Sequence, residues 1–425
     1  MNSYKSVGNA AVYLAANVIV AVIQFGIVPV LTRMMGPENF GMAALYLVTV
    51  SLLLPVTGLS LHGLVTVKYF KTTQSELAQL IGVILSIVVT NSLFVVVLAA
   101  LFGDVIVSTV GLNYYWLSLA VLSALLQSVV LVTLALFQAR ENPLAYGTVQ
   151  VGTALTVAAM TLVMTLELDG NWSARVWGHL SGYGVAVLSA LYFFNKAGFL
   201  VRTEKVFFSN VKECYSFGIP LVPHALGGVA LVSAGQMLLA SRHGPADVGF
   251  YALSMQFGAA FGLMADAFVK AYTPWVFKQL KKQDEESKIL VVKGICLAIL
   301  VFPVLALIFW AMIRLIFDWV VGQGFDEAKP LLGYFCAAGA FVGMYYSVAN
   351  LYFFTQQTGK LASITITAGV VGIITMFGLG NALGLEGYAA GYLVGQICLF
   401  ILTWVMSWKY CALPWRNVLF RRQAL

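Results

Sequence analysis

Long runs of apolar residues recur along the whole 425-residue sequence, and this pattern constrains the fold more than any other feature. A helix that crosses the hydrocarbon core of a bilayer needs about 20 predominantly apolar residues. Twelve segments of the sequence meet this requirement. Because every backbone polar group in lipid has to be satisfied within its own element, these segments predict an all-α polytopic membrane protein.

The predicted spans divide into two sets of six. The first set is Gly8 to Thr32, Phe40 to Val67, Leu77 to Phe102, Tyr114 to Gln138, Leu144 to Leu166 and Ala174 to Phe194. The second set is Tyr215 to Ser241, Val248 to Tyr272, Ile289 to Ile313, Pro330 to Phe354, Leu361 to Leu383 and Glu386 to Tyr410.

Composition excludes several classes of protein. Hydrophobic residues make up 60% of the chain and charged residues only 10%, whereas about a quarter of a soluble chain is charged. The net charge of +7 would suggest nucleic acid in a soluble protein, but basic loops on one face of a membrane protein explain it first. The five cysteines are scattered without a CxxC spacing, and no nucleotide-binding or zinc motif is present. We therefore expect no nucleic-acid partner, no metal site, no cofactor and no catalytic residue.

The charge of the loops predicts the orientation. Most of the 24 lysines and arginines fall on the side of the membrane that holds both termini. Because cytoplasmic loops carry the excess of Lys and Arg, both termini are expected in the cytoplasm.

The two halves of the chain share an internal repeat. Gly36, Pro37 and Gly41 match Gly244, Pro245 and Gly249 at an offset of 208 residues, and the Gly182-Tyr183 pair matches Gly391-Tyr392 at an offset of 209. Glycine–proline turns also recur in unrelated polytopic proteins, but one offset across most of each half favours a repeat. The sequence therefore predicts two six-helix lobes in one orientation, residues 1–205 and 206–425, related by an axis along the membrane normal, with a substrate site between the repeats.

Some of these residues also carry a family resemblance. Thr32 and Arg33 followed by Gly36-Pro37-Glu38 and Phe40-Gly41 resemble the LTRxLGPExFG signature of the polysaccharide and O-antigen flippases. The segments Gly218 to Pro223 and Val248 to Ala252 resemble the same family, which belongs to the multidrug/oligosaccharidyl-lipid/polysaccharide exporter superfamily.

The resemblance implies a fold and a function. It implies two lobes around a V-shaped cavity, and alternating access that moves undecaprenyl-diphosphate-linked oligosaccharides from the cytoplasmic to the periplasmic leaflet of the bacterial inner membrane. The implied process is the synthesis of a surface polysaccharide, such as the O-antigen of lipopolysaccharide. The implied partners are the lipid-linked oligosaccharide, membrane lipid and other polysaccharide assembly proteins. Many relatives carry an Asp-Arg pair late in the seventh span, where this chain has Gly235-Gln236, so an ion site on that pair is not expected here.

Ionisable residues inside the spans are the candidates for function, because an ion at the bilayer centre costs about 3 kcal/mol or more. Asp266 and Lys270 in the eighth span are four residues apart and are expected to share a helix face. Alternatively, Lys270 extends to the interface and Asp266 only neutralises it. His62 falls on Lys270 under the repeat offset, although a single histidine on an apolar helix is more often a packing residue.

Five further residues complete the candidate substrate site. Arg33 and Arg242 lie at the predicted periplasmic ends of helices, where they would hold a departing diphosphate or act as interfacial anchors. His224 follows two prolines of the seventh span, which lack backbone N–H groups and so break the helical hydrogen bonds and free carbonyl groups. His224 would therefore either take part in transport or form hydrogen bonds at this break in the helix. Asn17 and Gln24 on the first span would offer hydrogen bonds to sugars, and polar packing between helices is the competing interpretation.

Two other functions compete with the flippase. A drug/cation antiporter of the same superfamily would share the architecture, with H+ or Na+ as the candidate counter-ion. It would be expected to carry acidic residues deep in the first lobe, where the sequence has none at mid-depth. A membrane enzyme of the same glycan pathway would need a catalytic extracytoplasmic loop, and the longest one predicted, 314–329, is short and lacks histidine. We therefore expect a transporter and not an enzyme.

Overall fold

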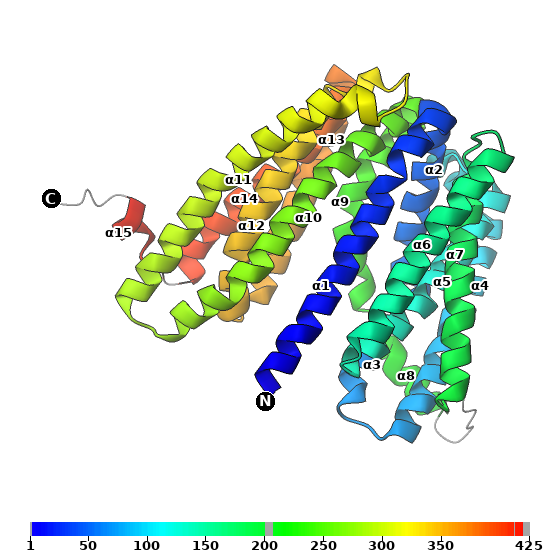
Figure 1. The fold of residues 1–425 in the computed structure, drawn as a ribbon, viewed down its shortest axis with the longest axis horizontal. Coiled ribbons are helices and arrows are strands. Elements are labelled where there is room, and N and C mark those ends of the chain that lie inside the picture. Colours follow the sequence, from blue (N-terminus) through cyan, green and yellow to red (C-terminus); the bar gives the residue numbers. More distant parts are fainter. Residues whose placement is uncertain (1, 200–206, 412, 420–425) are drawn as a thin grey trace. The chain divides into compact units, whose positions relative to one another are not determined.

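The computed structural model describes residues 2–199, 207–411 and 413–419, and within them every regular element is a helix (Figure 1). Ten helical stretches of the described chain are long and apolar enough to cross a membrane. They comprise α2 (Val28–Gly58), α4 (Gln74–Val110), α5 (Tyr114–Ala139), α6 (Pro143–Glu167), α8 (Phe207–Gly218) together with α9 (Leu221–Arg242), α10 (Pro245–Lys281), α11 (Glu285–Val320), α12 (Leu331–Phe354), α13 (Thr358–Leu383) and α14 (Leu385–Tyr410). The two other predicted spans correspond to α1 (Asn2–Gly26) and α7 (Ser173–Lys196). The predicted all-α membrane fold is confirmed, and the predicted number of twelve spans is consistent with these helices.

The first two predicted spans differ in detail from the helices that form. The first span consists of α1 and the beginning of α2, and α2 leaves helical geometry at Gly36, where φ is 66° and ψ is 170°. Pro37 disfavours the helical region for the residue before it, and glycine adopts a positive φ without steric cost. The Gly36-Pro37 pair therefore turns the chain between the first and second spans.

The second span is broken near its end. Leu59 and Ser60 both adopt left-handed backbone conformations, with φ of 47° and 52°, and the short helix α3 (Leu61–Tyr69) follows. The seventh span is broken in a similar way between α8 and α9, where Pro220 lacks the N–H that a continuous helix requires. The prolines of the seventh span indicated its break, whereas the break at Leu59 and Ser60 was not predicted, because a hydropathy pattern does not register a break of two residues.

The described chain forms two compact units. Unit 1 contains Met1–Val229, Ala240–Gly249 and Val321–Gln323, and unit 2 contains the remainder. The predicted lobe boundary at residues 205 and 206 lies outside the described residues and stays a prediction. A core cluster of unit 1 is built by residues of α3, α4, α5, α7 and α8, with Ile81, Ile84 and Leu136 fully buried.

Helices α10 to α14 contribute the main core of unit 2, together with the short helix α15 (Trp415–Leu419). Trp415 is part of this core, because its side chain is only 1% exposed. Its indole stacks on that of Trp408, with ring centroids 6.1 Å apart. Trp415 therefore attaches α15 to α14.

A closely packed helix pair built on repeated glycines occurs in each unit. In unit 1, side chains at Gly178 and Gly182 of α7 would strike Thr161 and Val157 of α6. In unit 2, side chains at the equivalent Gly387 and Gly391 of α14 would strike Leu379 and Met376 of α13. Small residues four apart allow helix backbones to approach in lipid. The glycines of the internal repeat therefore perform the same packing role in both units.

Candidate functional site

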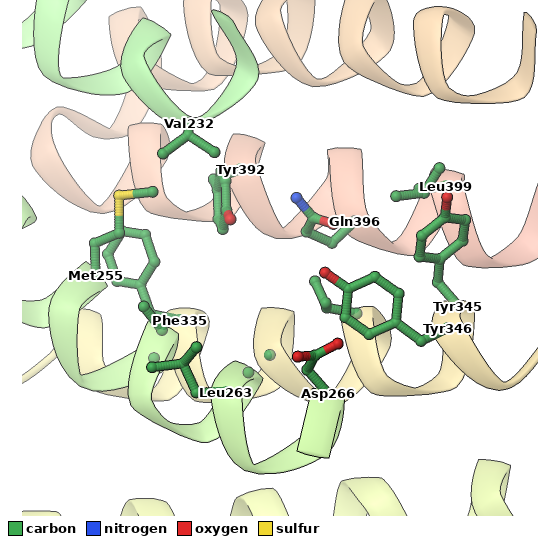
Figure 2. A pocket seen from close by; sticks show the side chains of 15 residues that line it. Val232, Met255, Leu263, Asp266, Phe335, Tyr345, Tyr346, Tyr392, Gln396 and Leu399 are labelled. Atoms are coloured by element: carbon green, nitrogen blue, oxygen red, sulfur yellow. The ribbon is translucent and has the colours of Figure 1, made fainter. Parts of the chain in front are cut away.

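A pocket of about 510 Å³ lies inside unit 2 among α9, α10, α12 and α14 (Figure 2). Its lining is mostly apolar and aromatic, with few polar groups. The residues that line it are Val232, Met255, Gly258, Ala259, Gly262, Leu263, Asp266, Phe335, Gly339, Val342, Tyr345, Tyr346, Tyr392, Gln396 and Leu399.

Small residues on α10 create this space. A side chain at Gly258 would strike the backbone of Phe335, so this glycine allows α10 to approach α12. A Cβ atom at Gly262, in contrast, would meet nothing within 4 Å. Under the repeat offset of 208, the equivalents of Gly258 and Gly262 in α2 are Val50 and Leu54. The second repeat therefore has open space at Gly262, whereas the first repeat has the side chain of Leu54 at the equivalent position.

The polar groups of the pocket come from three helices. Figure 2 shows the Asp266 carboxylate, the Tyr346 hydroxyl and the Gln396 amide directed into the same space. Gln396 is buried and shares a side-chain hydrogen bond with Tyr392. Carboxylate, phenol and amide oxygens beside aromatic faces form an environment that favours a cation over an anion.

Asp266 also forms an ion pair outside the pocket. The Nζ atom of Lys270 lies 2.5 Å from its Oδ2 atom, as the four-residue spacing predicted. The Lys270 side chain is 69% exposed and that of Asp266 is 33% exposed. The carboxylate therefore connects the pocket to an exposed cation, and a proton or another cation in the pocket would compete with Lys270 for it.

The other candidates lie elsewhere on the molecule. Of the eight predicted residues, all of which the structure describes, Asp266 alone lines the pocket. His62 is half-buried on α3, Arg33 is exposed on the first part of α2, and His224 and Arg242 are exposed at opposite ends of α9. Binding of substrate by these residues stays a prediction.

The two polar residues of the first span have different surroundings. Asn17 accepts a hydrogen bond from Nε2 of Gln150 on α6, at 2.8 Å, which is the polar packing between helices that competed with sugar binding. Gln24 is exposed on α1. A role of either residue in sugar binding stays a prediction.

Tyr346, Tyr392 and Gln396 were missed by the sequence analysis, which searched for charges. A signal was nevertheless present for two of them. Tyr392 belongs to the repeated Gly-Tyr pair, and Gln396 follows it by four residues on the same face of α14. The search also missed His179 in unit 1, which is 8% exposed and packs against the rings of Tyr46 and Tyr183.

Comparison with known proteins identifies the family of the chain. The family model described as polysaccharide biosynthesis protein matches residues 6–280. An uncharacterized membrane protein of Haemophilus influenzae is 23% identical over 383 residues, which cover 87% of this chain and 89% of that protein.

Two solved structures share the fold. The chain is similar to the lipid II flippase MurJ in an inward closed conformation, with a TM-score of 0.71, 10% identity, and coverage of 93% of this chain and 87% of that one. It is also similar to an inward-facing multidrug resistance MATE family transporter of the MOP superfamily, with a TM-score of 0.68, 12% identity, and coverage of 94% and 97%.

Both likenesses have low sequence identity, so they show the fold alone, and the family rests on the family model. The model matches more than half of the chain and includes the Gly36-Pro37 and Gly244-Pro245 turns. The protein therefore belongs to the polysaccharide biosynthesis protein family, as a multi-pass membrane protein with the fold of MurJ and MATE transporters.

Proposed function

We propose that the protein flips an undecaprenyl-diphosphate-linked oligosaccharide from the cytoplasmic to the periplasmic leaflet of the bacterial inner membrane, by alternating access. The observation that carries the proposal is the family match, because it links a transporter fold to polysaccharide biosynthesis. The matched flippase structure supports it, since that protein is named for flipping lipid II.

The chemistry of such a substrate explains why a helical transporter suits it. The prenyl tail stays in lipid, whereas the diphosphate and the sugars need shelter from the hydrocarbon, where an ion costs about 3 kcal/mol or more. In this proposal Arg33, Arg242, His62, His224 and Lys270 supply the cationic or hydrogen-bonding contacts to the diphosphate and the glycan. Asn17 and Gln24 supply further hydrogen bonds to sugars.

The pocket of unit 2 favours a second element of the proposal. Asp266 is the acidic group of a space lined by tyrosines, and its present partner is an exposed lysine. In our proposal Asp266 takes up H+ or Na+ as the counter-ion of transport, and Lys270 is released when the ion binds. The same aromatic pocket also favours the competing function, a drug/cation antiporter, because aromatic faces and a carboxylate bind organic cations.

A deletion strain separates the two functions. If the protein is the flippase, the strain loses a surface polysaccharide and accumulates the lipid-linked unit in the cytoplasmic leaflet, where a periplasmic glycan-modifying enzyme does not reach it. The wild-type gene restores export. If surface glycan persists in the deletion strain and sensitivity to cationic drugs increases, the proposed function is wrong and the antiporter takes its place.

A further inference from the structure

The α10–α11 hairpin contains a second pocket, which the transport proposal does not use. It has a volume of about 400 Å³ and is lined by Gln279, Lys282, Asp284, Glu286, Ser287, Ile289, Leu290 and Lys293. A water molecule in the liquid occupies about 30 Å³, so this space is too large for a single ion. Its size suits a polar group of several atoms.

The floor of this hairpin pocket is an ordered turn. Ser287 donates its backbone N–H to Oδ1 of Asp284 at 2.7 Å, and its hydroxyl donates to Oδ2 at 3.0 Å. These hydrogen bonds hold the pKa of Asp284 below its usual value, so the carboxylate is ionised at neutral pH and caps α11. The hydroxyl of Ser287 also lies within hydrogen-bond distance of Oε1 of Gln279, at 3.3 Å, which ties α10 to α11.

The charges around the pocket balance each other. Lys282 and Lys293 face Asp284 and Glu286, which gives two cations and two carboxylates. Among the described residues neither lysine forms an ion pair, and all four side chains belong to exposed residues. A net-neutral pocket with separated charges matches a zwitterion better than it matches an anion.

One wall of the pocket continues into an exposed apolar stripe. Leu290, Leu297, Leu300 and Val304 are exposed on α11, at 45%, 61%, 68% and 57%. With Lys293 between Leu290 and Leu297, these residues follow one another at intervals of three or four, which places them on one helix face. Side chains on a helix point toward its N-terminus, so Lys293 is directed from this stripe toward the hairpin. The pocket therefore lies where a lipid headgroup meets its acyl chains.

We propose that the α10–α11 hairpin binds the zwitterionic headgroup of a phosphatidylethanolamine-type lipid. Lys282 and Lys293 contact its phosphate, Glu286 accepts hydrogen bonds from its primary ammonium group, and the acyl chains lie along the stripe from Leu290 to Val304. The site is separate from the pocket that contains Asp266, and it does not depend on which substrate the protein transports.

Native mass spectrometry of the purified full-length protein tests this site. The protein is mixed with equal amounts of phosphatidylethanolamine, phosphatidylglycerol and phosphatidylcholine in detergent, and the retained lipids are counted. We expect selective retention of phosphatidylethanolamine. The double variant Lys282→Gln/Lys293→Gln lowers that retention about thirtyfold, because each lysine near a lipid phosphate contributes about 1 kcal/mol and the two together about 2 kcal/mol. Glu286→Gln abolishes the preference for phosphatidylethanolamine over phosphatidylcholine, which has no N–H.

The matched control is Lys278→Gln/Lys281→Gln, which removes the same charge from the last turn of α10 outside the pocket. It should leave the retained phosphatidylethanolamine unchanged. Equal losses in the two double variants would show unspecific attraction of basic residues to lipid and would overturn the proposal. Stronger retention of phosphatidylglycerol by the wild type would also overturn it. Unfolding is not a concern, because the substituted side chains are exposed and outside ion pairs, and unchanged melting confirms this for each variant.

Discussion

Gly41 of α2 and Gly249 of α10, which the internal repeat places at equivalent positions, pack backbone to backbone in unit 1. A Cβ atom at Gly41 would strike the carbonyl of Pro245, and one at Gly249 would strike the carbonyl of Pro37. The contact is reciprocal, because Gly41 of the first repeat meets Pro245 of the second, and Gly249 of the second repeat meets Pro37 of the first. The first turn of α10 therefore contacts α2 as closely as helix backbones allow.

We expect Gly41→Ala to destabilise the protein, because the added methyl group would collide with backbone atoms, which cannot move aside as a flexible side chain can. Overpacking of this kind costs about 1–3 kcal/mol. Thermal unfolding in detergent should show a lower melting temperature for Gly41→Ala and for Gly249→Ala. The control is Gly227→Ala in α9, where a Cβ atom meets nothing within 4 Å. Equal melting of all three variants would contradict the close contact.

Filling the pocket of unit 2 should separate transport from stability. Gly262→Leu introduces the residue that α2 has at the equivalent position, into space that is open around Gly262. We expect unchanged melting and transport reduced about tenfold or more, because the new side chain occupies the space beside Asp266. Restoration of surface polysaccharide in the deletion strain measures transport. Full restoration by Gly262→Leu would remove this pocket from the mechanism.

The ion pair on α10 gives a test of the role of Asp266. Asp266→Asn should impair transport, and Asp266→Asn/Lys270→Ala should stay impaired. The physical reason is that Lys270 is largely exposed, so losing its partner costs little, whereas the carboxylate has no replacement as an ion carrier. Export of the lipid-linked glycan by single and double variants is the measurement. Recovery in the double variant would show that Asp266 only neutralises Lys270.

The predicted orientation is tested by fusions to a reporter that is active only in the cytoplasm. We expect activity after Lys71, which follows α3, and after Lys282, which follows α10. Fusions after Asp169, between α6 and α7, and after Asp326, beyond α11, should be inactive. The excess of basic residues on the first set of loops is the reason. Activity after Asp169 would contradict both the orientation and the number of spans in the first half.

The candidate site was predictable only in part. Asp266 and Lys270 were found because an ionised pair four residues apart in an apolar helix stands out in any sequence. Tyr346, Tyr392 and Gln396 were not found, because uncharged polar residues are common in membrane helices and their meeting depends on how α10, α12 and α14 pack. Asn17 has a packing partner in α6, since it accepts a hydrogen bond from Gln150, and its role in sugar binding stays a prediction.

The sequence by itself determined those features that the lipid environment requires of each helix separately. The length of an apolar run and the charge of the adjacent loop are local quantities, so the spans and the expected orientation followed from them, and the repeat followed from residues that match at a constant offset. The tertiary structure decided features that depend on neighbouring helices: the break at Leu59 and Ser60, the burial of Trp415 and the pocket beside Gly262. The sequence alone does not distinguish a glycine that allows two helices to pack closely from a glycine that leaves open space. Only the atoms opposite them, at Gly258 and Gly262, distinguish a packed interface from a cavity.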